Sequence, residues 1–210
     1  MNESWYSFIA IIFGFLFLFY INKWDLVDMT GLAKKRAIKG MPALSKRLKM
    51  KHDVGRTDLR QGELSFKTKQ YEVNILADHN RISVIFNRPL GIYLLSGKDQ
   101  RKSGRPENLQ DIIFSKNKLN EFFKEQLIHS KTTENGSFNN SILEESLVEF
   151  IEKFKGRKFT NFSLRDDTLH IIFAYRDYLP LPLIEEATPK IINIANALIS
   201  VNRDNTTNNP

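Results

Sequence analysis

Apolar and polar residues alternate strictly in several short segments after residue 60, and this pattern constrains the fold more than any other feature. The alternation is clearest in "GELSFKT", "YEVNILA" and "RISVIFN", and it continues after Pro89 in "PLGIYLLS". A period of two is typical of strands that bury one face. Because turn residues such as "ADHN" separate the segments, we predict an antiparallel meander at the start of the domain.

A second group of alternating segments lies near the C-terminus. Residues 160–164 and 169–175 both alternate, and "RDDT" between them is rich in turn-forming aspartate. Asp is favoured in turns because its side chain can hydrogen-bond to nearby backbone groups. These residues therefore predict a β-hairpin that is separate from the first meander.

Helical spacing of apolar residues separates the two groups of strands and follows the second. A helix is expected at 118–127, another from a capping box formed by Ser141 and Glu144, and a last one capped by Thr188 with Pro189 in its first turn. Segregated strands and helices predict an α+β fold, with antiparallel hairpins covered by helices on one face. The predicted inner face of the second helix consists of Leu143, Leu147, Phe150, Ile151 and Phe154.

An uncharged run from Trp5 to Ile21 precedes the domain. As a helix it spans about 26 Å, close to the roughly 30 Å thickness of a hydrocarbon core. Aromatic residues lie near both ends, no basic residue precedes the run, and no small-residue cleavage site follows it. We therefore predict one uncleaved transmembrane helix ahead of the α+β domain.

The net charge of +7 is concentrated directly after this run. Residues 23–60 contain eleven Lys and Arg against four acidic residues, whereas residues 61–210 are nearly neutral. Because cations are retained on the cytoplasmic side, the sequence predicts a single-pass inner-membrane protein with its N-terminus outside and its domain in the cytoplasm. The expected organisation is an anchor at 1–24, a basic juxtamembrane segment at 25–60, a domain at 61–201 and a disordered tail at 202–210.

The basic segment is expected to contain a short helix that begins near Pro42. Its apolar face favours packing on the core of the domain, and contact with anionic lipid is the alternative. Nucleic acid is not expected, because no interleaved aromatic residues or recognisable motif accompany the charge. The residues that would contact lipid are Lys34, Lys35, Arg36, Lys39, Lys46 and Arg47.

Few residues in the sequence indicate a catalytic or metal-binding site. The chain has no cysteine, and its four histidines lack the spacing of a metal site on a helix. Asp166 and Asp167 precede His170 in the predicted hairpin, so a metal site or an acid–base site there is one hypothesis. The alternative, which the pattern favours, is that both aspartates stabilise a turn. No cofactor, phosphate-binding loop or nucleophile motif is predicted.

The succession "ALSKRL", "GELSF", "YEVNI", "DIIF" and "DDTLHIIF", followed by an amphipathic helix, covers about residues 43–200. It resembles a widespread class of bacterial proteins of unknown function that have an N-terminal hydrophobic segment and one α+β domain. The resemblance implies no catalytic residues.

Three functions follow as hypotheses. The leading one is a membrane-anchored, non-enzymatic binding or scaffolding domain that meets a membrane-protein partner. The alternatives are a metal-dependent enzyme that uses Asp166, Asp167 and His170, and a module that binds anionic lipid.

Overall fold

The computed structural model describes residues 11–14, 32–53, 63–96, 109–129, 137–138, 140–157, 159–175 and 178–204. These residues confirm the predicted α+β fold. Within the described ranges, nine strands form one sheet in the order β1-β2-β3-β4-β11-β10-β5-β8-β6, and every neighbouring pair is antiparallel. The strands are β1 (Lys51–Asp53), β2 (Glu63–Lys67), β3 (Tyr71–Leu76), β4 (Arg81–Phe86), β5 (Ile92–Ser96), β6 (Leu109–Asp111), β8 (Phe123–His129), β10 (Phe159–Arg165) and β11 (Thr168–Phe173).

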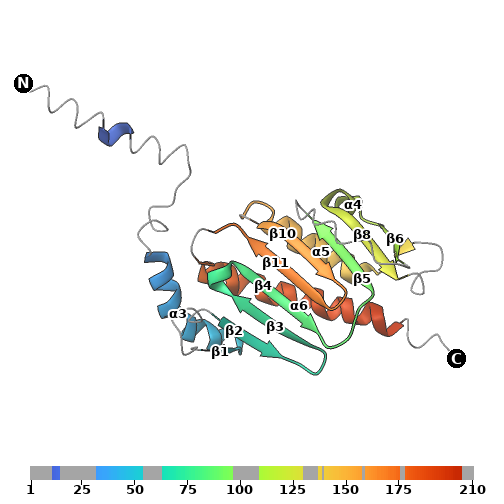
Figure 1. Ribbon diagram of the computed structural model, residues 1–210, viewed down its shortest axis with the longest axis horizontal. Coiled ribbons are helices and arrows are strands. Elements are labelled where there is room, and N and C mark those ends of the chain that lie inside the picture. The colour runs from blue at the N-terminus through green and yellow to red at the C-terminus, as the bar shows by residue number, and fades with distance from the viewer. Residues whose placement is uncertain are drawn as a thin grey trace, which may run out of the picture.

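The C-terminal hairpin is inserted into the first group of strands. β2, β3 and β4 form the predicted meander, but β11 and β10 lie between β4 and β5 (Figure 1). The insertion places Leu169 and Ile171 at the centre of the sheet, where both are fully buried. Alternation of residue type identifies a strand but carries no information about its neighbours, so the sequence pattern could not predict this order.

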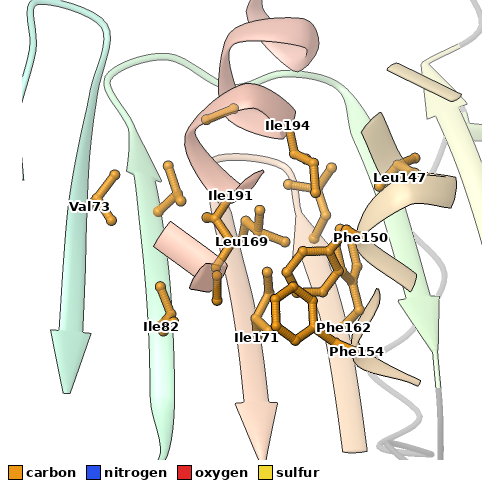
Figure 2. Packing of buried hydrophobic residues seen from close by; sticks show 14 of the residues in the cluster. Val73, Ile82, Leu147, Phe150, Phe154, Phe162, Leu169, Ile171, Ile191 and Ile194 are labelled. Carbon is orange, nitrogen blue, oxygen red and sulfur yellow. The ribbon is translucent and has the colours of Figure 1, made fainter. Parts of the chain in front are cut away.

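Helices α5 (Ser141–Phe154) and α6 (Leu181–Asp204) lie behind the strands in Figure 1 and cover one face of the sheet. Figure 2 shows Leu147, Phe150 and Phe154 of α5 meeting strand residues such as Phe162. Phe150 and Phe154 pack at a ring-centroid separation of 4.7 Å, and Phe154 meets Phe173 edge to face at 6.1 Å. All five residues predicted for the inner face of α5 are buried, which confirms that prediction.

Helix α3 (Leu32–Leu48) packs against α6 and β1. Met41 and Leu44 are fully buried, so the apolar face of α3 belongs to the core. This confirms the expectation that this face packs on the core of the domain. The helix begins ten residues before Pro42, which lies inside it and not in its first turn. Gly40 allows the close approach to α6, since a Cβ at this position would lie 2.2 Å from Leu181 Cδ1.

Other boundaries differ from the predicted ones. The helix expected at 118–127 is only α4 (Asn117–Phe122), and the chain continues directly as β8. Thr188 and Pro189 lie within α6, where the Thr188 hydroxyl donates to the Ile184 carbonyl at 2.6 Å. Two very short strands, β7 (Ile113–Phe114) and β9 (Ser137–Phe138), form a separate parallel pair, and η2 (Ala77–His79) is one turn of 3-10 helix. Most of the tail predicted at 202–210 lies outside the described residues.

The prediction of a transmembrane helix is wrong for the residues that the structure describes. No helix in the described part of the chain is long and apolar enough to cross a membrane. Within the expected span, residues 11–14 are described as a helical turn, and both ends, Trp5 and Ile21, lie outside the described residues. The predicted single-pass inner-membrane localisation, with the N-terminus outside and the domain in the cytoplasm, depended on that helix and is withdrawn with it.

Candidate functional site

The two faces of the sheet differ in what covers them. Strand residues such as Val73, Ile82 and Leu169 point toward α5 and α6 (Figure 2). Successive residues of a strand point to opposite faces, so the residues between them lie on the face away from these helices. We call this second surface the open face. Its residues are mostly half-buried, and Ile85 is 43% exposed there.

A row of small polar side chains crosses the middle of the open face. The strand register aligns Ser65 with Asn74, Asn74 with Ser83, Ser83 with His170, and His170 with Ser163. Directly opposed residues on one face of an antiparallel pair are close enough for their side chains to interact. The row therefore brings together hydroxyl, amide and imidazole groups from five neighbouring strands.

His170 is the titratable group in this row. Its Nδ1 lies 2.9 Å from the Ser83 Oγ, and Ser83 is almost fully buried. Burial lowers the pKa of His170, and the nearby guanidinium groups of Arg81 and Arg165 lower it further. The imidazole is therefore held in its neutral form at pH 7, which leaves one ring nitrogen as a donor and the other as an acceptor.

Arg81 and Arg165 lie diagonally across from His170 on opposite sides. Arg81 on β4 is opposite Ile172, two residues beyond His170, whereas Arg165 on β10 is opposite Thr168, two residues before it. Diagonal neighbours of this kind have Cα atoms about 7–8 Å apart, within reach of an arginine side chain. The charge of both arginines therefore acts on His170 at the centre of the open face.

Two polar atoms on this part of the open face are buried without a hydrogen-bond partner. They are the Arg81 Nε and the Asn161 Oδ1, which flank Ile172 from the two adjacent strands. A third such atom is the Oδ1 of Asn80, the residue directly before β4. Buried polar groups are normally hydrogen-bonded, so atoms without partners in one region suggest a place where a ligand or water binds. The alternation of residue types in the sequence did not predict a site at these residues.

Asp166 and Asp167 stabilise the turn between β10 and β11. Asp166 has a φ of 51°, and its Oδ1 accepts a hydrogen bond from the Gly91 N–H at 2.9 Å. Its backbone N–H donates to the Ile92 carbonyl, and the Phe86 N–H donates to the Asp167 carbonyl at 2.7 Å. The two aspartates therefore attach the inserted hairpin to the segment that joins β4 to β5.

The aspartates and His170 do not converge on one point. The Asp167 carboxylate accepts from the Thr168 hydroxyl at 2.9 Å, and His170 pairs with Ser83. The field of both carboxylates reaches Tyr93, whose pKa is raised first by burial and then by these charges. Over the residues that the structure describes, no group of three His, Asp or Glu side chains could hold a metal ion.

A pocket lies between α4 and α5. It has a volume of about 490 Å³, an apolar floor and a charged rim. Lys118 and Glu152 form an ion pair at its rim. The floor consists of Leu119, Phe122, Val148 and Ile151.

The residues predicted to contact lipid lie on α3. Lys35, Arg36, Lys39 and Lys46 are exposed on the side opposite to the buried Met41 and Leu44, and the side chain of Lys34 lies outside the described part. Arg47 differs from them, because it forms a bidentate pair with Glu185 at 2.7 and 3.0 Å. The structure therefore gathers four of the six cations into one solvent-facing surface.

Comparisons with known proteins add little to this description. No protein-family model matches the sequence, and no curated protein matches it. The solved structure of the mycobacterial trehalose monomycolate transport factor A, TtfA, is similar with a TM-score of 0.38 and 9% sequence identity. The match covers 80% of this chain and 94% of that chain. A likeness this weak supports no statement about function.

Proposed function

We propose that this chain is a non-catalytic binding domain that holds a protein partner on the open face of its sheet. The observation that carries the proposal is the contrast between the two faces. The described helices pack on one face, whereas the other presents exposed Ile85 together with a polar row and two arginines. Mixed apolar and polar surfaces with arginine are common at protein interfaces.

The arrangement of the polar groups supports binding over catalysis. Ser83 and His170 form a pair, but the third group that would orient the imidazole of a nucleophile–base system is missing from the described residues around it. The aspartates predicted for that role hydrogen-bond to the Gly91 backbone and to Thr168 instead. The metal-dependent alternative has no support from the described residues.

Site-specific photocross-linking tests this proposal. A photoreactive amino acid replaces Ile85 on the open face, and the matched control replaces Ile142 on α5, which is also exposed. In cells that produce the chain natively, we expect a discrete cross-linked adduct from position 85 and none from position 142. Equal adducts from both positions, or none from position 85, would show that the open face does not bind a partner.

A second candidate function is binding to an anionic lipid surface through α3. The observation that favours it is the gathering of Lys35, Arg36, Lys39 and Lys46 on one side of the helix. Each cation near such a surface contributes about 1 kcal/mol of attraction. None of the four has an ion-pair partner within the described part of the chain, so their charge is available.

Vesicle binding of the full chain distinguishes this candidate. Vesicles of phosphatidylcholine alone are compared with vesicles that also contain phosphatidylserine. The variant Lys35→Gln/Lys39→Gln/Lys46→Gln should bind the anionic vesicles less tightly than wild type. The control Lys69→Gln/Arg88→Gln/Lys155→Gln has the same net charge, with exposed residues changed elsewhere, and should retain wild-type binding. If both variants lose affinity equally, net charge rather than α3 is responsible.

A further inference from the structure

Arg81, the first residue of β4, has an unusual environment. It is half-buried on the open face, its Nε is buried without a hydrogen-bond partner, and no ion pair of its guanidinium occurs among the described residues. Desolvation of a charged group is unfavourable unless a partner compensates it. The side chain is therefore placed to receive an acceptor that the described chain itself does not provide.

Two acidic residues on or next to this face are engaged elsewhere. Glu72 pairs with Lys67 at 3.7 Å near the edge of the meander, and the Asp166 carboxylate accepts from the Gly91 N–H. The field around His170 is consequently dominated by Arg81 and Arg165. An anionic group that approached the centre of the open face would be attracted by both.

Resting on the proposed function, we propose that Arg81, with His170 beside it, binds a carboxylate of an acidic segment of the protein partner, while the charge of Arg165 adds to the attraction. A carboxylate matches the planar guanidinium and accepts two of its N–H groups. The hydroxyl of Ser163 and the imidazole of His170 lie beside that position in the polar row. The segment would cross the sheet near Ile172.

The unpartnered amide oxygens indicate a peptide rather than a free anion. Asn161 Oδ1 and Asn80 Oδ1 are acceptors, so they require N–H or O–H donors. A peptide supplies carboxylate acceptors and backbone N–H donors in one molecule. A small carboxylate ion supplies acceptors alone, and it would leave both amide oxygens unsatisfied.

Titration of the full chain with a blocked oligoglutamate peptide tests the inference. Two-dimensional amide spectra are recorded at low ionic strength, where charge attraction is least screened. We expect shifts at Ser83, Ser163 and His170, and an affinity about tenfold lower for Arg81→Gln, the factor expected when one hydrogen bond to a charged group is lost. The control Arg36→Gln removes an exposed arginine from α3 and should change the affinity less than about twofold. Should Arg81→Gln fail to fold, Arg81→Lys retains the charge without Nε and should still weaken binding.

Three results would overturn the inference. They are shifts confined to α3, equal affinity of Arg81→Gln and wild type, and equal responses to inorganic phosphate or to a neutral oligoglutamine peptide. The cross-link from position 85 separates this inference from the proposed function. If oligoglutamate does not bind but the cross-link forms, the acidic-segment inference is wrong and the open face remains a binding surface. If the cross-link is absent as well, both are wrong.

Discussion

Ser83 and His170 face each other across strands β4 and β11, with the Ser83 Oγ 2.9 Å from His170 Nδ1. This pair is the centre of the polar row on the open face. Ser83 belongs to the N-terminal meander and His170 to the C-terminal hairpin, so the pair forms only because that hairpin is inserted beside β4. The geometry of the open face therefore depends on the insertion.

Stability should depend on pH through His170. In the unfolded chain the imidazole titrates near its ordinary pKa of 6.5, and in the folded chain burial and the two arginines lower that pKa. Between the two values the unfolded state binds more protons, so the free energy of unfolding increases with pH in the window below 6.5. Urea unfolding across this window should show the increase in wild type and a smaller slope in His170→Gln.

The control for this experiment is Asn74→Ala, which changes the same polar row without removing a titratable group. It should retain the wild-type slope. An unchanged slope in His170→Gln would mean that burial does not disfavour the charged imidazole.

Replacing Arg81 with an apolar residue should stabilise the fold. Arg81→Met retains the length of the side chain and removes a buried Nε that has no hydrogen-bond partner. Relief of one unsatisfied buried group is worth about 1–2 kcal/mol. We expect chemical denaturation to show a gain of that size for Arg81→Met and a change within about 0.5 kcal/mol for Arg36→Met on exposed α3. A loss of stability in Arg81→Met would show that the guanidinium already has a compensating partner.

Local patterns predicted the elements of the fold better than their arrangement. The strands of the meander, the hairpin and the buried face of α5 follow from the periodicity of apolar residues, because burial of one face imposes that periodicity. The position of β10 and β11 between β4 and β5 does not follow, since pairing depends on contacts between distant segments. The same limit applies to "NEFFKEQL", where helical spacing continued past Phe122 although the chain pairs with β5 as a strand.

The candidate site was predictable only in part. His170 was singled out from its position near two aspartates, but its partner is Ser83, which is 87 residues away in sequence. Arg81 was missed because a single arginine at the start of a strand is common on solvent-exposed faces. Its importance comes from a buried atom without a partner, and that property exists only once the sheet has formed.

Glu144 should be one of the most sensitive polar residues of the domain. It was expected to form a capping box with Ser141, but Asn140 caps α5 by accepting from the Leu143 N–H. The buried Glu144 carboxylate instead accepts from the N–H groups of Ser115 and Lys116 at 2.9 and 3.1 Å and from the Ser115 hydroxyl.

Glu144→Ala would leave these donors without an acceptor and should cost about 2–4 kcal/mol in the free energy of unfolding. The adjacent Glu145 is exposed and pairs with Lys116 at 3.9 Å, so Glu145→Ala should change stability by less than about 0.5 kcal/mol. Thermal and urea unfolding of the two variants would measure the difference. Similar values for both would mean that the Glu144 carboxylate does not hold the segment before α4.

Substitution of Asp166 should separate the structural role of the turn from a metal-binding role. The residue has a φ of 51° and accepts a hydrogen bond from the Gly91 N–H. Asn tolerates this backbone conformation and retains an acceptor oxygen, so Asp166→Asn should change the free energy of unfolding by less than about 0.5 kcal/mol. Ala has neither property, and Asp166→Ala should cost about 1–3 kcal/mol because both the left-handed conformation and the lost hydrogen bond are unfavourable. A metal site would give the opposite pattern, in which a divalent ion stabilises wild type and both variants abolish that effect equally. Differential scanning fluorimetry of the three proteins with and without divalent ions would therefore distinguish a turn that anchors the inserted hairpin from a turn that binds a cation.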